Sequence, residues 1–166
     1  MSFVTVGVTQ SYADSTATML TVPDTGMEVT IDIGEPDNIY PDNKQDAGKR
    51  PALWVLTKIY GVKDIVFSGH FYKSMEVKKD KDILHLDYVD GVLICKGKEL
   101  KEFYIAGAGN IFYPAKAKNK GEAVMVWSKE VKEPVAVKFA FSNTAQPNLF
   151  NKAGLQATAF KTDNRK

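Results

Sequence analysis

Few side chains in this sequence are suited to acid–base or nucleophilic chemistry. The chain has two histidines, His70 and His85, and one cysteine, Cys95. His85 alternates with Leu84 and Leu86, so a strand here would place it on the sheet face opposite those leucines. His70 lies at the edge of another strand-like run. We interpret both histidines as structural or surface residues rather than as catalytic bases.

The cysteine and the serines fit no nucleophile pattern. Cys95 ends the apolar run of residues 91–95, where a cysteine normally behaves as a small buried hydrophobe. One cysteine excludes an internal disulfide, and two histidines without a carboxylate at ligand spacing predict no metal site. Ser68, Ser74 and Ser128 lie outside any Gly-x-Ser-x-Gly or Gly-Asp-Ser-Leu segment. We therefore predict neither a nucleophile nor a metal nor a cofactor.

Aromatic side chains offer a different chemistry, the stacking of sugar rings. Trp127 and Tyr113 are the candidate substrate-binding residues, because their neighbours Val126 and Phe112 would point to the other face of their strands. The simpler interpretation is that aromatics at alternate strand positions fill the core. The sequence leaves both interpretations open.

The composition is that of an ordinary soluble globular protein. Of 166 residues, 44% are apolar and 25% charged, and 22 basic residues against 20 acidic ones give a net charge of +2. This balance favours neither nucleic acid nor a membrane as a partner. Lysines in runs such as Lys78-Lys79-Asp80-Lys81-Asp82 are diluted by acids, so we interpret them as solvated turns. No secretory signal or membrane-spanning stretch is visible, and the compartment stays unassigned.

The first third of the chain has the pattern of an α/β unit. Residues 1–20 are polar, with a short strand indicated by alternating valines up to Val8. Residues 27–33 alternate apolar and polar side chains, which predicts a strand, and residues 34–43 predict a loop. A helix follows at about 43–60, ending at Gly61. Because proline is tolerated in a first helical turn, Pro51 leaves open a later start near Arg50.

The rest of the chain has the pattern of an all-β sandwich. Short alternating runs recur every 8–12 positions between turn residues. We expect a frayed tail over residues 142–166. The runs are 65–72, 74–78, 83–88, 92–95, 103–106, 111–117, 123–127 and 135–141.

Three segments carry a more specific resemblance. They are Thr25-Gly26-Met27-Glu28-Val29-Thr30-Ile31-Asp32-Ile33-Gly34-Glu35-Pro36, then Ser68-Gly69 with Tyr72-Lys73-Ser74-Met75, and Asn148-Leu149-Phe150-Asn151-Lys152-Ala153-Gly154-Leu155. Their order and spacing resemble the C-terminal portion of bacterial sialate O-acetylesterase-like proteins, which are carbohydrate esterases among the SGNH (GDSL-type) hydrolases. The resemblance extends from Val22 to Asp163, and residues 1–20 match poorly.

The resemblance implies an architecture that agrees with the change of pattern along the chain. The expected fold is mainly β: a jelly-roll-like C-terminal sandwich preceded by a strand–loop–helix remnant of an SGNH α/β domain. The implied boundaries are a poorly assigned segment at 1–21, the hydrolase remnant at 22–64 and the sandwich at 65–163. In such enzymes a serine, located well upstream of this region, attacks the acetyl carbonyl and a histidine in the late loop accepts its proton.

The late loop departs from the family pattern. The family's Ile-His-Pro corresponds to Ile39-Tyr40-Pro41 here, so Tyr40 replaces the catalytic histidine. Asp37 stands where the family often has an Asp that orients the histidine. Tyrosine has an ordinary pKa of about 10 and is a poor base at neutral pH. The resemblance thus implies a degenerate catalytic pair, Asp37 and Tyr40, without a nucleophile.

Three hypotheses follow. The chain is a truncated relative of a carbohydrate O-acetylesterase, inactive on its own, with a structural or carbohydrate-associated role. Alternatively, it is an ester hydrolase that works with a partner chain or a re-purposed site. The third hypothesis is a carbohydrate-binding β-sandwich module. The expected partners are a glycan or acetylated sugar, and either a second copy or a missing hydrolase half that covers the apolar helix face around Leu53, Trp54 and Ile59.

Overall fold

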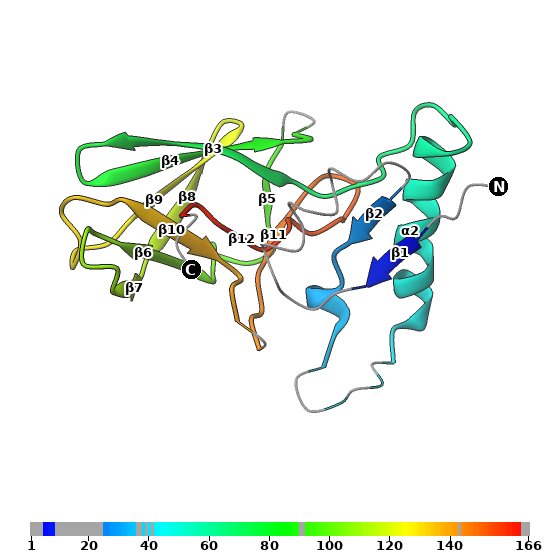
Figure 1. Ribbon diagram of the computed structural model, residues 1–166, viewed down its shortest axis with the longest axis horizontal. Coiled ribbons are helices and arrows are strands. Elements are labelled where there is room, and N and C mark those ends of the chain that lie inside the picture. The colour runs from blue at the N-terminus through cyan, green and yellow to red at the C-terminus, as the bar shows by residue number, and fades with distance from the viewer. Residues whose placement is uncertain are drawn as a thin grey trace.

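The computed structural model describes residues 5–8, 25–35, 38, 40, 42–89, 92–142 and 144–163. Figure 1 shows two parts side by side along the long axis. Antiparallel strands form a sandwich at one end, and a two-stranded parallel sheet with one long helix forms the other.

The parallel sheet and its helix are built from elements far apart in sequence. β1 (Thr5–Val8) pairs in parallel with β2 (Thr25–Glu28), and α2 (Lys44–Lys58) packs against β2. Parallel strands normally occur in sheets that are covered on both faces and joined through crossovers. This unit therefore has the local architecture of a piece of an α/β sheet, as the sequence pattern predicts.

The strand predicted over residues 27–33 is wrong beyond its first two residues. β2 ends at Glu28, and the 3-10 helix η1 (Ile31–Ile33) follows. The amide of Ile33 donates to the carbonyl of Thr30 at 3.2 Å, so the chain forms a local turn instead of a ladder. Ile31 is buried in this turn. A turn that buries one isoleucine has the same short alternation of apolar and polar residues as a strand, and this explains the wrong prediction.

Helix α2 has the two ends that the sequence predicts. Asn43 caps its start, because the Asn43 Oδ1 accepts from the Asp46 amide at 3.1 Å. At the other end Gly61 adopts a positive φ of 66°, which lets the chain leave the helix. The alternative start near Arg50 is wrong, since Pro51 lies inside the helix. The cap at Asn43 nucleates the helix before the proline.

The first sandwich sheet has the strand order β3-β4-β9-β8 and is antiparallel throughout. The strand predicted at 65–72 is wrong over residues 65–70, since β3 begins only at Phe71; a bulge after Tyr72 lets β3 continue through the run predicted at 74–78. Alternate side chains such as Leu84 and Val124 face the core and are fully buried. The strands are β3 (Phe71–Lys78), β4 (Lys81–Asp87), β9 (Ala123–Trp127) and β8 (Lys116–Lys120).

The second sheet packs its inner face against the first. Its order is β12-β10-β6-β7, and the short pair β5–β11 extends the β structure beside it. Ile105, Val137 and Phe139 are fully buried members of the shared core. The predicted mainly β, sandwich-type fold is therefore confirmed. The strands are β6 (Phe103–Ala106), β7 (Phe112–Pro114), β10 (Ala136–Phe139), β12 (Phe160–Lys161), β5 (Ile94–Cys95) and β11 (Leu149–Phe150).

The frayed tail predicted for residues 142–166 is wrong over most of its length. Leu149 is fully buried, and Ala157 and Thr158 are nearly so. Residues 164–166 lie outside the described structure. The turn-rich composition of this segment misled the prediction, because Asn148, Asn151 and Gln156 are buried hydrogen-bonding groups rather than solvated ones.

These polar groups tie the tail to the linker that joins α2 to the sandwich. The Asn151 Nδ2 donates to the carbonyl of Ser68 at 2.8 Å. The amide and the hydroxyl of Thr158 both donate to the carbonyl of His70 at 3.0 Å. Between these contacts the backbone carbonyl of Gln156 lies directly against Gly69. We call this set of contacts the tail–linker clamp.

The clamp predicts the effect of adding one methyl group. A Cβ at position 69 would stand 1.8 Å from the Gln156 carbonyl oxygen, so Gly69→Ala must displace backbone. We expect a loss of about 3 kcal/mol in the free energy of unfolding, measured by chemical denaturation. Gly48→Ala is the matched control, because it lies inside α2 with nothing within 4 Å. The control should gain roughly 0.5 to 1 kcal/mol, and equal behaviour of the two variants would contradict the clamp.

Candidate functional site

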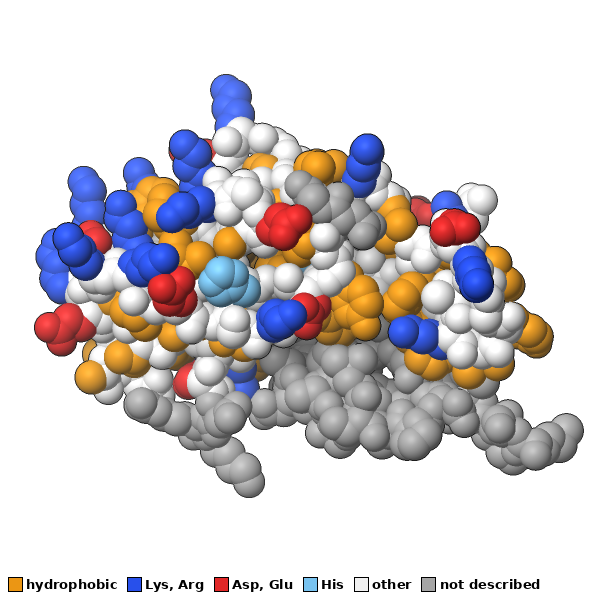
Figure 2. Space-filling model, turned by 90° about the horizontal axis from the view of Figure 1, so that it is seen from above, with side chains coloured by type: hydrophobic (Ala, Val, Ile, Leu, Met, Phe, Trp, Pro, Cys, Tyr) orange, Lys and Arg blue, Asp and Glu red, His pale blue; other side chains and the backbone are white. Residues whose placement is uncertain are grey.

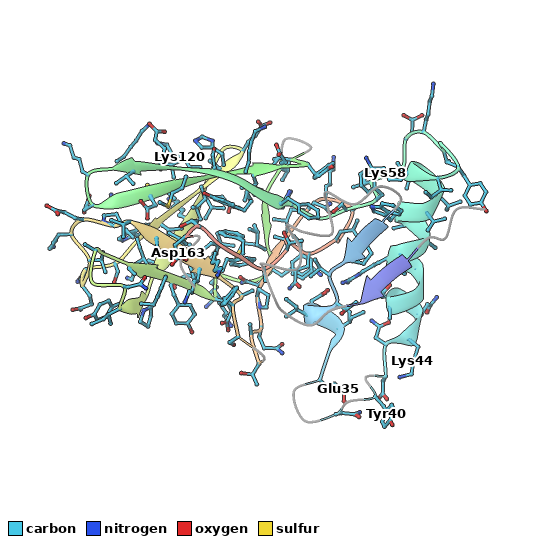
Figure 3. The ribbon with its side chains drawn as sticks, in the orientation of Figure 1. Glu35, Tyr40, Lys44, Lys58, Lys120 and Asp163 are labelled. Carbon is cyan, nitrogen blue, oxygen red and sulfur yellow. The ribbon has the colours of Figure 1, made fainter. Side chains whose placement is uncertain are left out.

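The loop after η1 presents Tyr40 to solvent. Tyr40 is 71% exposed, and its backbone amide donates to the Asn38 Oδ1 at 2.9 Å. The Asn38 Nδ2 in turn donates to the Glu35 carboxylate at 3.0 Å, so this acid braces the loop. Figure 3 shows Glu35 and Tyr40 together, away from the sandwich and near Lys44 at the start of α2. Asp37, the other predicted member of the pair, lies outside the described residues.

Neither histidine is available to act as a base beside Tyr40. His70 is 1% exposed, and its Nδ1 and Nε2 lie 3.1 and 3.2 Å from the carbonyl oxygens of Tyr88 and Phe150. Because both nitrogens face carbonyls inside the fold, neither can accept a proton from an external nucleophile. His85 is exposed on the outer sheet face, opposite Leu84 and Leu86, as predicted.

A buried ion pair fixes the chain on both sides of the Tyr40 loop. Arg50 in α2 is buried, and its guanidinium donates to both carboxylate oxygens of Asp32 at 2.6 and 2.7 Å. It also donates to the carbonyl of Val29 just after β2. This bidentate geometry joins η1 to the helix that follows the loop. Sequence reasoning missed the pair, because nothing in the local pattern links Asp32 to a residue in a later helix.

Glu28, at the end of β2, is a buried acid near the same arginine. Burial raises its pKa to about 8 from an ordinary 4.5, and the positive charge of Arg50 opposes that rise. Its Oε1 has no hydrogen-bond partner among the described residues. Asp82 in β4 shows the same effect inside the sandwich, where burial raises its pKa to about 6. Strongly shifted acids mark candidate sites, but Glu28 has no nucleophile beside it in the described structure.

The two candidate sugar-stacking residues lie in separate pockets. Trp127 lines a cavity of about 510 Å³ between edge strand β8 and residues 95–100. Cys95 is partly exposed in this cavity rather than fully buried as predicted. Tyr113 lines a second cavity of about 430 Å³ with residues 107–109 and 130–133. The structure thus brings neither aromatic residue together with Tyr40, and it does not join the two in one site.

Two further properties concern metals and membranes. Among the residues that the structure describes, no three His, Cys, Asp or Glu side chains are grouped as metal ligands would be. No helix within the described ranges combines the length and the apolar character needed to cross a bilayer.

The raised pKa of Glu28 predicts how stability depends on pH. The folded state holds this proton more tightly than the unfolded chain, so stability falls as pH rises from about 4.5 through about 8. Glu28→Gln removes this loss and should stabilise the fold at alkaline pH by a few kcal/mol, up to roughly 5. Urea unfolding measured across the pH range would check the prediction.

A second variant distinguishes the contribution of Glu28 to the pH dependence of stability from the contribution of Asp82. Asp82→Asn should remove only the part of the loss between about pH 3.8 and about 6, where the Asp82 carboxyl titrates. A Glu28→Gln profile that keeps the wild-type fall in stability between neutral and alkaline pH would contradict the assignment to Glu28.

Comparison with known proteins relates part of this chain to a carbohydrate acetylesterase. No family profile matches the sequence, and no curated protein matches it. Among solved structures, the chain is similar to XAC1771, a novel carbohydrate acetylesterase from Xanthomonas citri, with 36% sequence identity and a TM-score of 0.86. The match covers 92% of this chain but only 35% of XAC1771. The chain is therefore related to a carbohydrate acetylesterase over about a third of that protein's length.

Proposed function

We propose that this chain forms the accessory β-sandwich and the last strand, loop and helix of a sialate O-acetylesterase-like carbohydrate esterase of the SGNH type. We further propose that on its own it has no esterase activity. The observation that carries the proposal is the match to XAC1771, which includes almost all of this chain and about a third of the enzyme. An acetylesterase needs a nucleophile and a base, and the position that corresponds to the family's histidine base holds Tyr40 in this chain.

The environment of Tyr40 supports the proposal that this loop is not catalytic. Its side chain is largely in solvent and makes no hydrogen bond with a described histidine or serine. A tyrosine that acts as a base needs a perturbing group that stabilises its ionised form. His70 is enclosed between two carbonyl oxygens and so does not serve this loop as a substitute base. The role left to this part of the molecule is structural or carbohydrate-associated.

A hydrolase that depends on another segment is the second candidate function. The helix face predicted to need a cover is only partly covered: Leu53 and Trp54 are half-buried, and Ile59 is 38% exposed. A two-stranded parallel sheet with one helix buries too little surface to be stable alone. We propose that a serine-bearing hydrolase half or a second copy of the chain packs on this unit.

The proposal predicts the result of an esterase assay. The purified chain should hydrolyse an acetyl-ester reporter such as p-nitrophenyl acetate at the buffer rate. Tyr40→His should stay at the level of Tyr60→His, because both create an exposed histidine on a tyrosine position that is more than 70% exposed, at 71% and 73%. Tyr60 lies beyond the far end of α2 and serves as the matched control for unspecific imidazole catalysis.

Two outcomes would contradict the proposal. Wild-type hydrolysis well above buffer would mean that the chain carries a complete site. Activity of Tyr40→His well above that of Tyr60→His would mean that a nucleophile and an oxyanion site already surround the loop, which favours a re-purposed hydrolase.

A further inference from the structure

The outer face of the first sandwich sheet concentrates positive charge around one tryptophan. The register places Trp127 between Lys81 of β4 and Lys116 of β8 in one cross-strand row. In the next rows Met125 stands beside Lys118, and Ala123 beside Lys120. Because Val124 and Val126 face the core, these residues all point outward. We call this surface the lysine face: Lys78, Lys81, Lys116, Lys118 and Lys120 around Trp127.

Few acids neutralise the lysine face. Glu76 is the acid in the cross-strand rows of the lysine face, and its Oε2 lies 3.2 Å from the Lys78 Nζ. Among the described residues, no ion pair involves Lys116, Lys118 or Lys120. Figure 2 shows the basic side chains gathered over the end of the molecule farthest from α2, with apolar side chains between them. A chain with a net charge of only +2 thus presents a strongly positive surface at one place.

The lysine face continues into the cavity beside β8. This cavity of about 510 Å³ is lined by Trp127, by Lys98, Lys116 and Lys118, and by a single acid, Glu99. Its size falls in the range of small-molecule sites, about 300 to 1,000 Å³. Asn119 also lines it and holds a buried amide oxygen without a described partner. The cavity thus combines an aromatic ring with lysine side chains.

We propose that the lysine face and this cavity bind an acidic oligosaccharide, with one sugar ring against Trp127 and its carboxylates on Lys116 and Lys118. The indole offers a flat apolar surface to the C–H face of a sugar, and lysine ammonium groups are mobile point charges suited to carboxylates. The choice of a carbohydrate rests on the proposed function. Binding does not require esterase activity, so the two proposals can fail separately.

The same surface is a poor match to nucleic acid. Single-stranded nucleic acids are bound by several aromatic platforms along a basic groove, on which successive bases stack. Among the described outward-facing residues of the lysine face, Trp127 is the only aromatic side chain on which a base could stack. Arginine, the side chain best suited to bidentate phosphate contacts, is absent from it. Of the two arginines in the sequence, Arg50 is buried against Asp32 and Arg165 lies outside the described residues.

The test is a titration with a short oligogalacturonate, followed by calorimetry at low and at physiological ionic strength. The Lys116→Gln/Lys118→Gln double variant should weaken binding about fivefold, and Trp127→Ala about tenfold. Lys63→Gln/Lys152→Gln and Tyr60→Ala are matched controls, since these exposed residues lie off the lysine face. The controls should bind as the wild type does. The fully methyl-esterified oligosaccharide, which has the same rings without charge, should bind at least about tenfold more weakly at low salt.

A fluorescence measurement guards against a folding defect in Trp127→Ala. In a Trp54→Phe background Trp127 is the remaining tryptophan, and oligogalacturonate should change its emission with the same affinity that calorimetry gives. Unchanged emission at saturation would overturn the proposal. So would absence of binding, equal loss in the control variants, equal binding of the methyl ester, or tighter binding of an oligothymidylate of similar length, which would assign the face to nucleic acid.

Discussion

Buried side-chain amides in the C-terminal segment hold the parts of this molecule in place. Asn151 reaches the linker after α2, while Asn148 donates to the carbonyls of Lys96 and Glu99 at 3.0 and 2.8 Å and accepts from the amide of Lys101 at 2.9 Å. One short segment therefore positions both the strand–loop–helix unit and the wall of the Trp127 cavity. Buried amides are costly unless their hydrogen bonds are made, so this segment tolerates little change in its partners.

The two regions with functional interest depend on this segment in different ways. The cavity beside β8 is formed directly by residues 95–100, which Asn148 fixes. The loop with Tyr40 is set by a local device, the bidentate pair of Arg50 and Asp32. The same chain thus contains a braced loop in which Tyr40 is exposed, and a separate cavity lined by lysines and by Trp127. This division is consistent with a part that holds or presents carbohydrate while chemistry takes place elsewhere.

The sequence predicts the elements of this fold better than their connections. Alternation located the strands β6 and β9 with correct bounds, and the cap and stop signals at Asn43 and Gly61 located the helix. Prediction from the sequence failed where the hydrogen-bond partner of a residue lies far away in the chain. The sequence predicts a frayed tail because Asn148 and Asn151 are residue types common in solvated turns, whereas their carbonyl partners lie far away in the chain. The lysines of β8 are exposed, and only the strand register shows that Lys116 and Lys118 flank Trp127 and Met125.

The central claim, that this chain carries no working nucleophile, is tested most directly by intact-mass measurement after treatment with a fluorophosphonate. Such reagents react with a serine only when a base and an oxyanion site activate it. The account predicts no adduct on the folded chain under conditions in which an active serine esterase is fully labelled. A stoichiometric adduct on one serine, lost when the protein is unfolded first, would contradict it.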